Sequence, residues 1–167
     1  FSDKEIKEVL DKYSVRYEKV ANIEKRVAEL IYQGKIVSWF QGRMEVGPRA
    51  LGNRSILGNP CLQDTHDKLN VAKGREKWRP LAPSFLAEEM DEYLENSAES
   101  PFMILSFNVK KNYRKELPAL THIDGTTRPQ SVSRLINQKY YNLISEFKKI
   151  SGFPVIMNTS FNGKKEP

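Results

Sequence analysis

Apolar side chains recur at spacings of three and four residues in three segments, which is the pattern of an amphipathic helix. The segments are residues 3–13, 20–32 and 136–150, and the last of them has the clearest pattern. Gly34 and Gly152 follow the second and third segments, at positions where glycine commonly ends a helix. The pattern therefore predicts three helices, each with one apolar face.

Short apolar segments between these helices predict β-strands. Residues 35–40 and 153–157 are the most apolar of them, and we expect both to be buried strands. Further extended segments are predicted at residues 55–57, 80–86, 102–109 and 126–133.

Two weaker helical patterns and two polar segments complete the chain. Residues 65–73 and 88–95 have the composition of helices. We expect residues 110–118 to be an exposed connection and residues 158–167 to be a turn-rich tail. Helices and strands mix without internal repeats, which predicts a single α/β or α+β domain.

The composition narrows the class of protein. The chain has 167 residues, of which 39% are hydrophobic and 29% charged. This length and composition are typical of one globular domain and not of a disordered or fibrous protein. No apolar run approaches the roughly 18 residues that a membrane helix needs. Cys61 is the single cysteine, which excludes an internal disulfide framework and a multi-cysteine zinc site. This cysteine usage makes a reducing, cytoplasmic setting the expected one. Since Phe1 opens the chain without the pattern of a signal or transit peptide, we expect an excised fragment.

The positive charge is concentrated in one part of the chain. The formal net charge is +6, and residues 34–84 hold nine Lys and Arg residues against four Asp and Glu residues. Five arginines of this region are interleaved with glycine, proline and asparagine instead of following a helix face. This arrangement favours convergence on a compact anion, and a solvated basic surface is the alternative.

A glycine-rich segment, residues 41–55, follows the first predicted strand. Its three glycines would let backbone amides approach a ligand closely, and Pro48 suits the first turn of a helix whose free amides favour an anion. Arg49 would then lie beside that anion. The segment matches neither a Walker loop nor a dinucleotide-binding turn, and a structural turn with surface arginines is the alternative.

A second cationic segment spans residues 73–80. Lys73 and Arg79 are six residues apart, so they would reach one site only if the chain turns at Gly74 or becomes extended. Trp78 is predicted to be a core residue, and the alternative is that its indole flanks a base or an arginine.

Polar residues follow a predicted turn within residues 121–130. Arg128 could close on a phosphate or carboxylate, with Thr126 and Gln130 on the same side of the strand. His122 is a candidate general base, although a structural role is more common for one histidine beside a turn. With two histidines in the whole chain, no His-rich metal site is predicted.

The polar tail begins where the last buried strand is predicted to end, which is where open α/β sheets hold ligands. The amides and hydroxyls of residues 158–162 suit hydrogen bonds to a nucleotide or a carbamoyl group. The same residue types are also ordinary in turns.

Taken together, four segments closely resemble the C-terminal domain of the nodulation-type O-carbamoyltransferases. They are residues 42–57, 79–84, 121–128 and 158–162. The resemblance covers about residues 35–167 and implies a single YrdC-like α/β (α+β) domain, with a twisted open mixed sheet flanked by helices. Residues 1–34 would be leading helices that link it to an N-terminal domain, and the family's chain continues beyond the equivalent of Pro167.

The resemblance implies an enzyme that uses carbamoyl phosphate and ATP, with Mg²⁺, to form carbamoyl adenylate and then carbamoylates a hydroxyl acceptor. An actin-like N-terminal domain of the same polypeptide would carry out the transfer and hold its own metal ion, so no metal site is expected in this chain. The sequence does not indicate which acceptor substrate is carbamoylated. A homodimer is one possible assembly. The residues implied to bind anions and support catalysis are Arg49, Lys73, Arg79 and Arg128. Asn158 and Ser160 would lie close to the carbamoyl or nucleotide group.

Two other classes of function stay open at this point. A nucleic-acid-binding module would fit the basic charge, although the chain lacks an RNP-type aromatic motif and its basic region is interrupted by glycine and proline. A non-catalytic scaffold domain of a larger enzyme is the other alternative.

Overall fold

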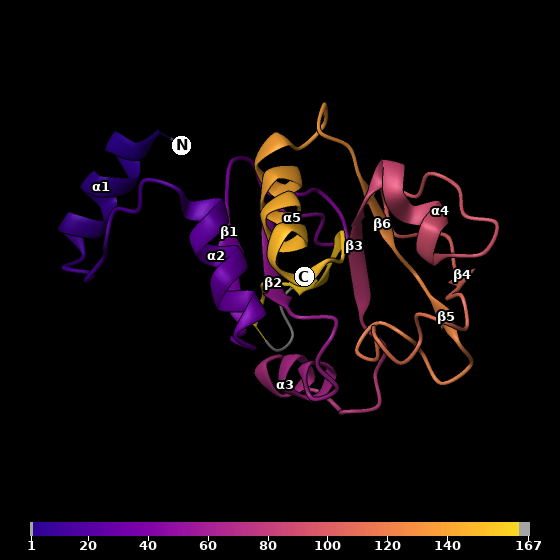
Figure 1. Ribbon diagram of the computed structural model, residues 1–167. Helices are drawn as coiled ribbons and strands as arrows, with labels where there is room; N and C mark the ends of the chain where they lie inside the picture. Colours follow the sequence, from indigo (N-terminus) through magenta and orange to yellow (C-terminus); the bar gives the residue numbers. More distant parts are fainter. Residues whose placement is uncertain (1, 164–167) are drawn as a thin grey trace.

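A five-stranded mixed sheet forms the centre of the computed structural model, which describes residues 2–163 (Figure 1). Its strands, in spatial order, are β1 (Val37–Phe40), β2 (Arg54–Gly58), β7 (Val155–Ser160), β3 (Ala82–Leu86) and β6 (Gln130–Val132). Neighbouring strands are antiparallel except for β3 and β6, which are parallel. The predicted mixed α/β sheet is confirmed.

Two helices cover one face of the sheet and pack against each other, α2 (Ile23–Tyr32) and α5 (Gln138–Ser151) (Figure 1). Ile31, Leu57 and Phe147 are fully buried in the core between them and the strands. The cap of α5 is Gly152, which has a φ of 82°, a left-handed conformation that glycine adopts without strain. α2 falls within the leading segment predicted at residues 1–34, yet it contributes to this core.

The opposite face packs against short helices and a long connection. α3 (Thr65–Ala72), the 3₁₀ turn η1 (Ala87–Glu89) and α4 (Met90–Tyr93) lie on this side, and a two-stranded ribbon of β4 (Phe107–Asn108) and β5 (Thr126–Thr127) follows. Leu69, Phe85 and Leu117 are fully buried in the core there.

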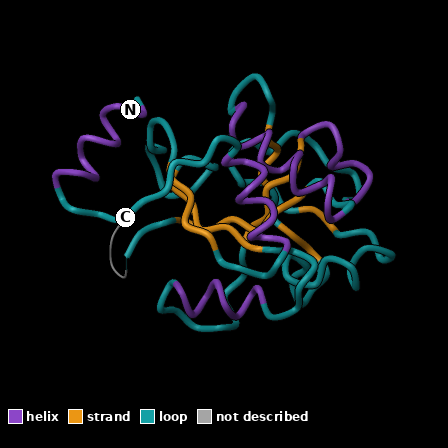
Figure 2. The backbone as a smooth tube through the Cα atoms, turned by 60° about the vertical axis from the view of Figure 1, so that its left-hand side comes forward, coloured by secondary structure: helices purple, strands orange, loops and turns teal. Residues whose placement is uncertain are grey.

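α1 (Asp3–Lys12) lies apart from the sheet in both views (Figures 1 and 2). Its N-terminus is closed by a capping box between Ser2 and Glu5. No residue of α1 is buried, so the apolar positions that predicted this helix face solvent. Among residues 2–163, no helix is long and apolar enough to cross a membrane.

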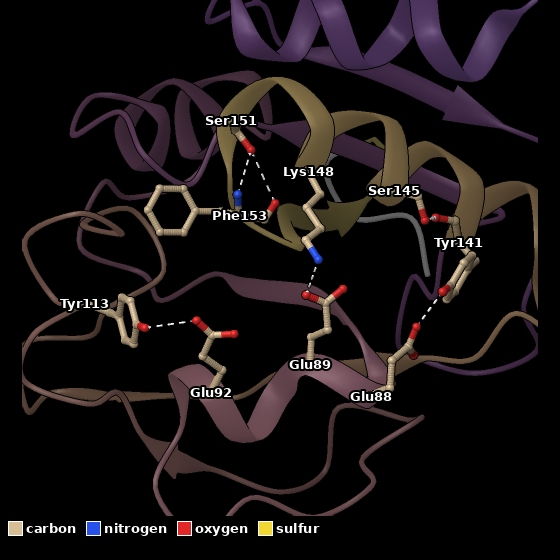
Figure 3. A network of polar contacts seen from close by, with 9 residues as sticks. All are labelled: Glu88, Glu89, Glu92, Tyr113, Tyr141, Ser145, Lys148, Ser151 and Phe153. Carbon is tan, nitrogen blue, oxygen red and sulfur yellow. Dashed lines mark hydrogen bonds and ion pairs between the residues drawn. The ribbon is translucent and has the colours of Figure 1, made fainter.

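Polar contacts join α5 to the segment that carries η1 and α4 (Figure 3). Lys148 Nζ lies 2.6 Å from a carboxylate oxygen of Glu89, and the Tyr141 hydroxyl donates a hydrogen bond to Glu88. Partly exposed pairs of this kind stabilise a fold by about 1 kcal/mol each. They orient the two segments, while the buried apolar side chains hold them together.

Four predictions about the strands and the segments beside them are wrong in part. The strand expected over residues 102–109 is reduced to β4, because several apolar side chains of that segment are exposed instead of packed. Residues 110–118 are not a wholly exposed connection, since Leu117 is buried. The expected tail starts too early, because β7 continues to Ser160 while paired with β2. A strand is present within residues 35–40, but the prediction that it is buried is wrong, because β1 is an edge strand in which Trp39 alone is buried.

Candidate functional site

The glycine-rich segment is a folded loop held by a glutamate. One carboxylate oxygen of Glu45 accepts hydrogen bonds from the backbone amides of Leu51, at 2.6 Å, and Asn53, at 2.8 Å. The Trp39 indole donates to the Gly52 carbonyl at 2.9 Å, which fastens the loop to β1. The loop therefore presents a fixed backbone next to the ends of the central strands.

The helix predicted to begin at Pro48 is absent, because residues 41–53 contain no helix. Gly47 and Gly52 have φ values of 126° and 100°, which a right-handed helix does not allow. The amides of Leu51 and Asn53, which would bond to preceding carbonyls in a helix, bind the Glu45 carboxylate instead. An anion at this loop therefore meets no helix N-terminus.

Three arginines from distant parts of the sequence line one cavity of about 170 Å³, which we call the central pocket. Arg49 belongs to the glycine-rich loop, Arg75 follows α3, and Arg128 lies between β5 and β6. Asn158 and Ser160 of β7 contribute polar groups to the same lining. The lining residues that the structure describes include no carboxylate, so fixed positive charge dominates this pocket.

A second cavity of about 320 Å³ adjoins the first, and we call it the lateral pocket. Lys73 and Arg79 line it. Arg75 and Ser160 line both this pocket and the central pocket. The chain turns at Gly74, where φ is 59°, and this turn brings the cations of the segment to one place. The structure thus distributes the predicted cations over two adjoining pockets instead of one.

Burial and mutual repulsion lower the pKa of two of these guanidinium groups. Burial lowers the pKa of Arg128, and the charge of Arg49 lowers it further. Burial likewise lowers the pKa of Arg75, with a further contribution from Arg79. Like charges held close together are costly without an anion, which favours entry of a phosphate or carboxylate into the central pocket. In the lateral pocket a carboxylate oxygen of Glu76 already lies 3.7 Å from the Arg79 guanidinium and partly offsets the repulsion.

Lys73 organises the end of β7. Its ammonium group donates to the Ser160 carbonyl at 2.7 Å, to the Ser160 hydroxyl at 3.2 Å and to the Asn162 carbonyl at 2.9 Å. It also contacts the side-chain oxygen of Asn162. These bonds fix Ser160 at the boundary between the two pockets.

Asn158 carries a buried acceptor that no described residue satisfies. Its side-chain nitrogen donates to the Ala50 carbonyl at 2.9 Å and to the Ser84 hydroxyl at 3.1 Å. The Ala50 carbonyl can only accept, so the orientation of the amide is fixed. The remaining oxygen, Oδ1, has no hydrogen-bond partner among residues 2–163, although the residue is 1% exposed and lines the central pocket. A ligand that donates a hydrogen bond would satisfy it.

Other predicted positions lie outside the two pockets. His122 Nε2 is 3.1 Å from the Leu81 carbonyl, a contact typical of a structural histidine. Thr126 donates to Asp124, and Gln130 is buried and bonded to Ser84, so neither joins Arg128 as predicted.

The prediction that Trp78 is a core residue is wrong, because its side chain is 77% exposed. The fully buried Asn70 donates to the carbonyls of Lys77 and Arg79, at 3.0 and 2.9 Å. Both neighbours of Trp78 are therefore tied to the protein by their backbone, and the indole between them projects outward.

Arg75 is the site residue that the sequence interpretation missed. Within residues 2–163 it is the one cation that lines both pockets, and its Nε donates to Asn70 Oδ1 at 2.6 Å. The available signal was the Lys73-Gly74-Arg75 run, since a turn at the glycine places both flanking cations near one site.

Comparison with known proteins identifies the family. The profile described as "Carbamoyltransferase C-terminus" matches residues 28–167. The chain belongs to this family. It is 45% identical over 157 residues to nodulation protein NolNO of Sinorhizobium fredii, an alignment covering 92% of this chain and 23% of NolNO. It is 36% identical over 147 residues to 3'-hydroxymethylcephem-O-carbamoyltransferase of Streptomyces clavuligerus, covering 88% of this chain and 28% of the relative. The carbamoyltransferase C-terminal chain thus spans about a quarter of these relatives.

Solved structures with low sequence identity share the fold of this carbamoyltransferase C-terminal domain. Sua5 of P. abyssi, complexed with L-threonine, aligns with a TM-score of 0.58 at 18% identity, over 90% of this chain and 42% of Sua5. Full-length HypF in its phosphate- and nucleotide-bound form aligns with a TM-score of 0.57 at 22% identity, over 90% of this chain and 22% of HypF. These likenesses confirm the Sua5-like, or YrdC-like, fold.

Proposed function

We propose that this chain is the part of an O-carbamoyltransferase that binds carbamoyl phosphate and ATP and forms carbamoyl adenylate. The observation that carries the proposal is the central pocket, where Arg49, Arg75 and Arg128 converge without a carboxylate among the described lining residues. Both substrates carry several negative charges that repel each other. Fixed guanidinium groups offset this repulsion and hold the reacting groups together.

The names of similar proteins support the same proposal. One relative is named as a carbamoyltransferase that acts on a hydroxymethyl group, and one protein of the same fold was solved with phosphate and nucleotide bound. The chain matches about a quarter of its relatives, and we propose that transfer to the acceptor is carried out by another part of the full-length enzyme. We assign that step, and the metal ion it uses, to an N-terminal actin-like domain. Residues 35–167 would be the carbamoyl-adenylate domain, and residues 1–34 would lead into it, with α2 of this leading segment packed on α5 as part of the core.

The reaction requires that carbamate and ATP be held in position, and it requires no nucleophilic side chain. Water releases phosphate from carbamoyl phosphate and leaves carbamate. A carbamate oxygen then attacks the α-phosphorus of ATP, forming the bond to AMP and releasing pyrophosphate. Arg49, Arg75 and Arg128 would neutralise the phosphates during both steps, and the unpartnered Asn158 Oδ1 would accept a hydrogen bond from the carbamoyl NH₂ group.

Lys73 and Arg79 would act beside the lateral pocket. Arg79 would contact a phosphate that extends from the central pocket, and Lys73 would position Ser160 between the pockets through the bonds it already makes. Glu76 is the single carboxylate among the described residues that line either pocket. Mg²⁺ bound to ATP would therefore be held mainly by phosphates and water, with Glu76 as a candidate protein ligand.

Calorimetric titration tests the proposal. Arg128→Ala and Arg79→Ala should each weaken binding of carbamoyl phosphate or ATP at least about tenfold, since a charge-assisted hydrogen bond contributes roughly 1.5–3 kcal/mol. Arg134→Ala is the matched control, because Arg134 is exposed and lines neither pocket. Unchanged affinities in both pocket variants would refute the proposal. RNA binding that falls steeply with salt, without binding of either substrate, would instead support a nucleic-acid module.

A further inference from the structure

Side chains from three separate strands bind the backbone of the glycine-rich loop. The consecutive carbonyls of residues 50–52 accept hydrogen bonds from Asn158 of β7 at 2.9 Å, from Gln130 of β6 at 3.0 Å and from Trp39 of β1 at 2.9 Å. These carbonyls directly follow Arg49 in the chain. The sheet therefore holds the part of the loop that carries this arginine of the central pocket.

Ser84 connects two of these side chains inside the core. Its hydroxyl donates a hydrogen bond to Gln130 Oε1 at 2.8 Å and accepts one from Asn158 Nδ2 at 3.1 Å. β3, which carries Ser84, lies between β7 and β6 in the sheet, so the three side chains form a hydrogen-bonded row across neighbouring strands. Because all three residues are buried, these bonds form without competition from solvent.

The loop determines the direction of every hydrogen bond in this row. The Leu51 carbonyl can only accept, so Gln130 presents its nitrogen to the loop and its oxygen to Ser84. Ser84 gives its single hydroxyl hydrogen to Gln130, which leaves only lone pairs for Asn158. Asn158 then uses both hydrogens of its nitrogen, on Ser84 and on the Ala50 carbonyl. Its oxygen, Oδ1, is left without a partner among residues 2–163.

We propose that Gln130 and Ser84 are positioning residues that determine substrate choice through Asn158, an inference that rests on the proposed function. Asn158 is among the described residues that line the central pocket, whereas Gln130 and Ser84 are not. These two residues hold the Asn158 amide so that its oxygen meets the NH₂ group of carbamoyl phosphate. Acetyl phosphate has nearly the same shape, but its methyl group cannot donate a hydrogen bond and leaves the buried oxygen unsatisfied. The row therefore selects a carbamoyl group against an acetyl group.

Titration calorimetry with carbamoyl phosphate, acetyl phosphate and inorganic phosphate tests the assignment. The unaltered chain should bind carbamoyl phosphate at least about tenfold more tightly than acetyl phosphate, the discrimination expected from one hydrogen bond to a buried acceptor. Gln130→Met approximately keeps the size of the side chain and removes both of its hydrogen bonds. Asn158 is then held less firmly, and the preference should fall to about threefold or less.

Inorganic phosphate reports on the arginines independently of Asn158. In Gln130→Met its affinity should change by less than about twofold, because the three arginines remain in the central pocket and Glu45 and Trp39 still bind the loop. Gln138→Met is the matched control. It makes the same chemical change at an exposed residue of α5 that does not line the central pocket, so the preference should be retained.

A second variant examines the middle of the row. Ser84→Ala removes the hydroxyl that joins Gln130 to Asn158, and it should lower the preference for carbamoyl phosphate to about the value found in Gln130→Met. Because Gln130 and Ser84 act in series on the same amide, the double variant should lower the preference no further.

The outcomes separate this inference from the proposed function. Equal affinity of the unaltered chain for carbamoyl phosphate and acetyl phosphate, or a preference that both single variants retain, would overturn the inference and leave the arginine site intact. Effects that add in the double variant would overturn the row as a connected unit. A fall in affinity for all three anions by the same factor would show a purely structural role and would also overturn the inference. Absence of binding of both carbamoyl phosphate and ATP by the unaltered chain would overturn the proposed function as well.

Discussion

The contact between Gly52 and Tyr140 gives a quantitative test of how the glycine-rich loop is held. Gly52 has a φ of 100°, and a Cβ added there would overlap the Tyr140 ring, which is fully buried and cannot move aside. Gly52→Ala should therefore incur about 1–2 kcal/mol of backbone strain and about 1–3 kcal/mol of overpacking. The free energy of unfolding should fall by roughly 2–5 kcal/mol, with a loss in Tm of about 2–4 °C per kcal/mol for a chain of this size.

Gly42→Ala is the matched control for this substitution. Gly42 lies in the same loop with a φ of 58°, and a Cβ added there has no atom within 4 Å. It should therefore show the backbone strain alone, about 1–2 kcal/mol. Urea unfolding followed by the fluorescence of the buried Trp39 measures both variants, since the Trp39 indole binds the Gly52 carbonyl. Equal losses of stability in the two variants would show that Tyr140 does not hold the loop as described.

Further predictions concern pH and the protein surface. Burial raises the pKa of the Cys61 thiol to about 11 from an ordinary value near 9. The protonated thiol therefore stabilises the folded chain fully below pH 9, and this stabilisation is lost as the pH rises through 11. Thermal melts between pH 8 and 11 should show this loss, Cys61→Ala should reduce it, and an identical pH profile in that variant would contradict the assignment. Trp78→Ala should change the free energy of unfolding by no more than about 0.5 kcal/mol in urea titrations, because the indole is exposed. A fall of several kcal/mol in the free energy of unfolding would instead show that Trp78 is a core residue.

The sequence predicted the helices and most central strands because their patterns follow from local geometry. The three-and-four spacing marks α2 and α5, and Gly152 ends α5 as expected. The prediction failed where apolar residues do not enter the core. Phe102 and Ile104 look like strand residues by type, yet both side chains are exposed. Residue type alone does not record which apolar groups find a packing partner.

The residue types of the site could be predicted from the sequence, but the separation of these residues into two pockets could not. The glycines and arginines of the loop indicated an anion site, and the structure brings Arg49 and Arg128 to one pocket. The separation into central and lateral pockets depends on the turn at Gly74 and on contacts between segments far apart in the sequence. The sequence did not indicate Arg75 as a site residue, because its position between the pockets depends on its hydrogen bond to the buried Asn70.

Transfer of AMP from ATP to carbamate is reversible, so exchange of labelled pyrophosphate into ATP in the presence of carbamoyl phosphate reports on carbamoyl adenylate formation. We expect exchange that requires carbamoyl phosphate, is lost in Arg75→Ala and is retained in Arg134→Ala, which removes an exposed arginine. Exchange that proceeds without carbamoyl phosphate, or that survives the removal of the Arg75 guanidinium shared by both pockets, would refute the proposed function.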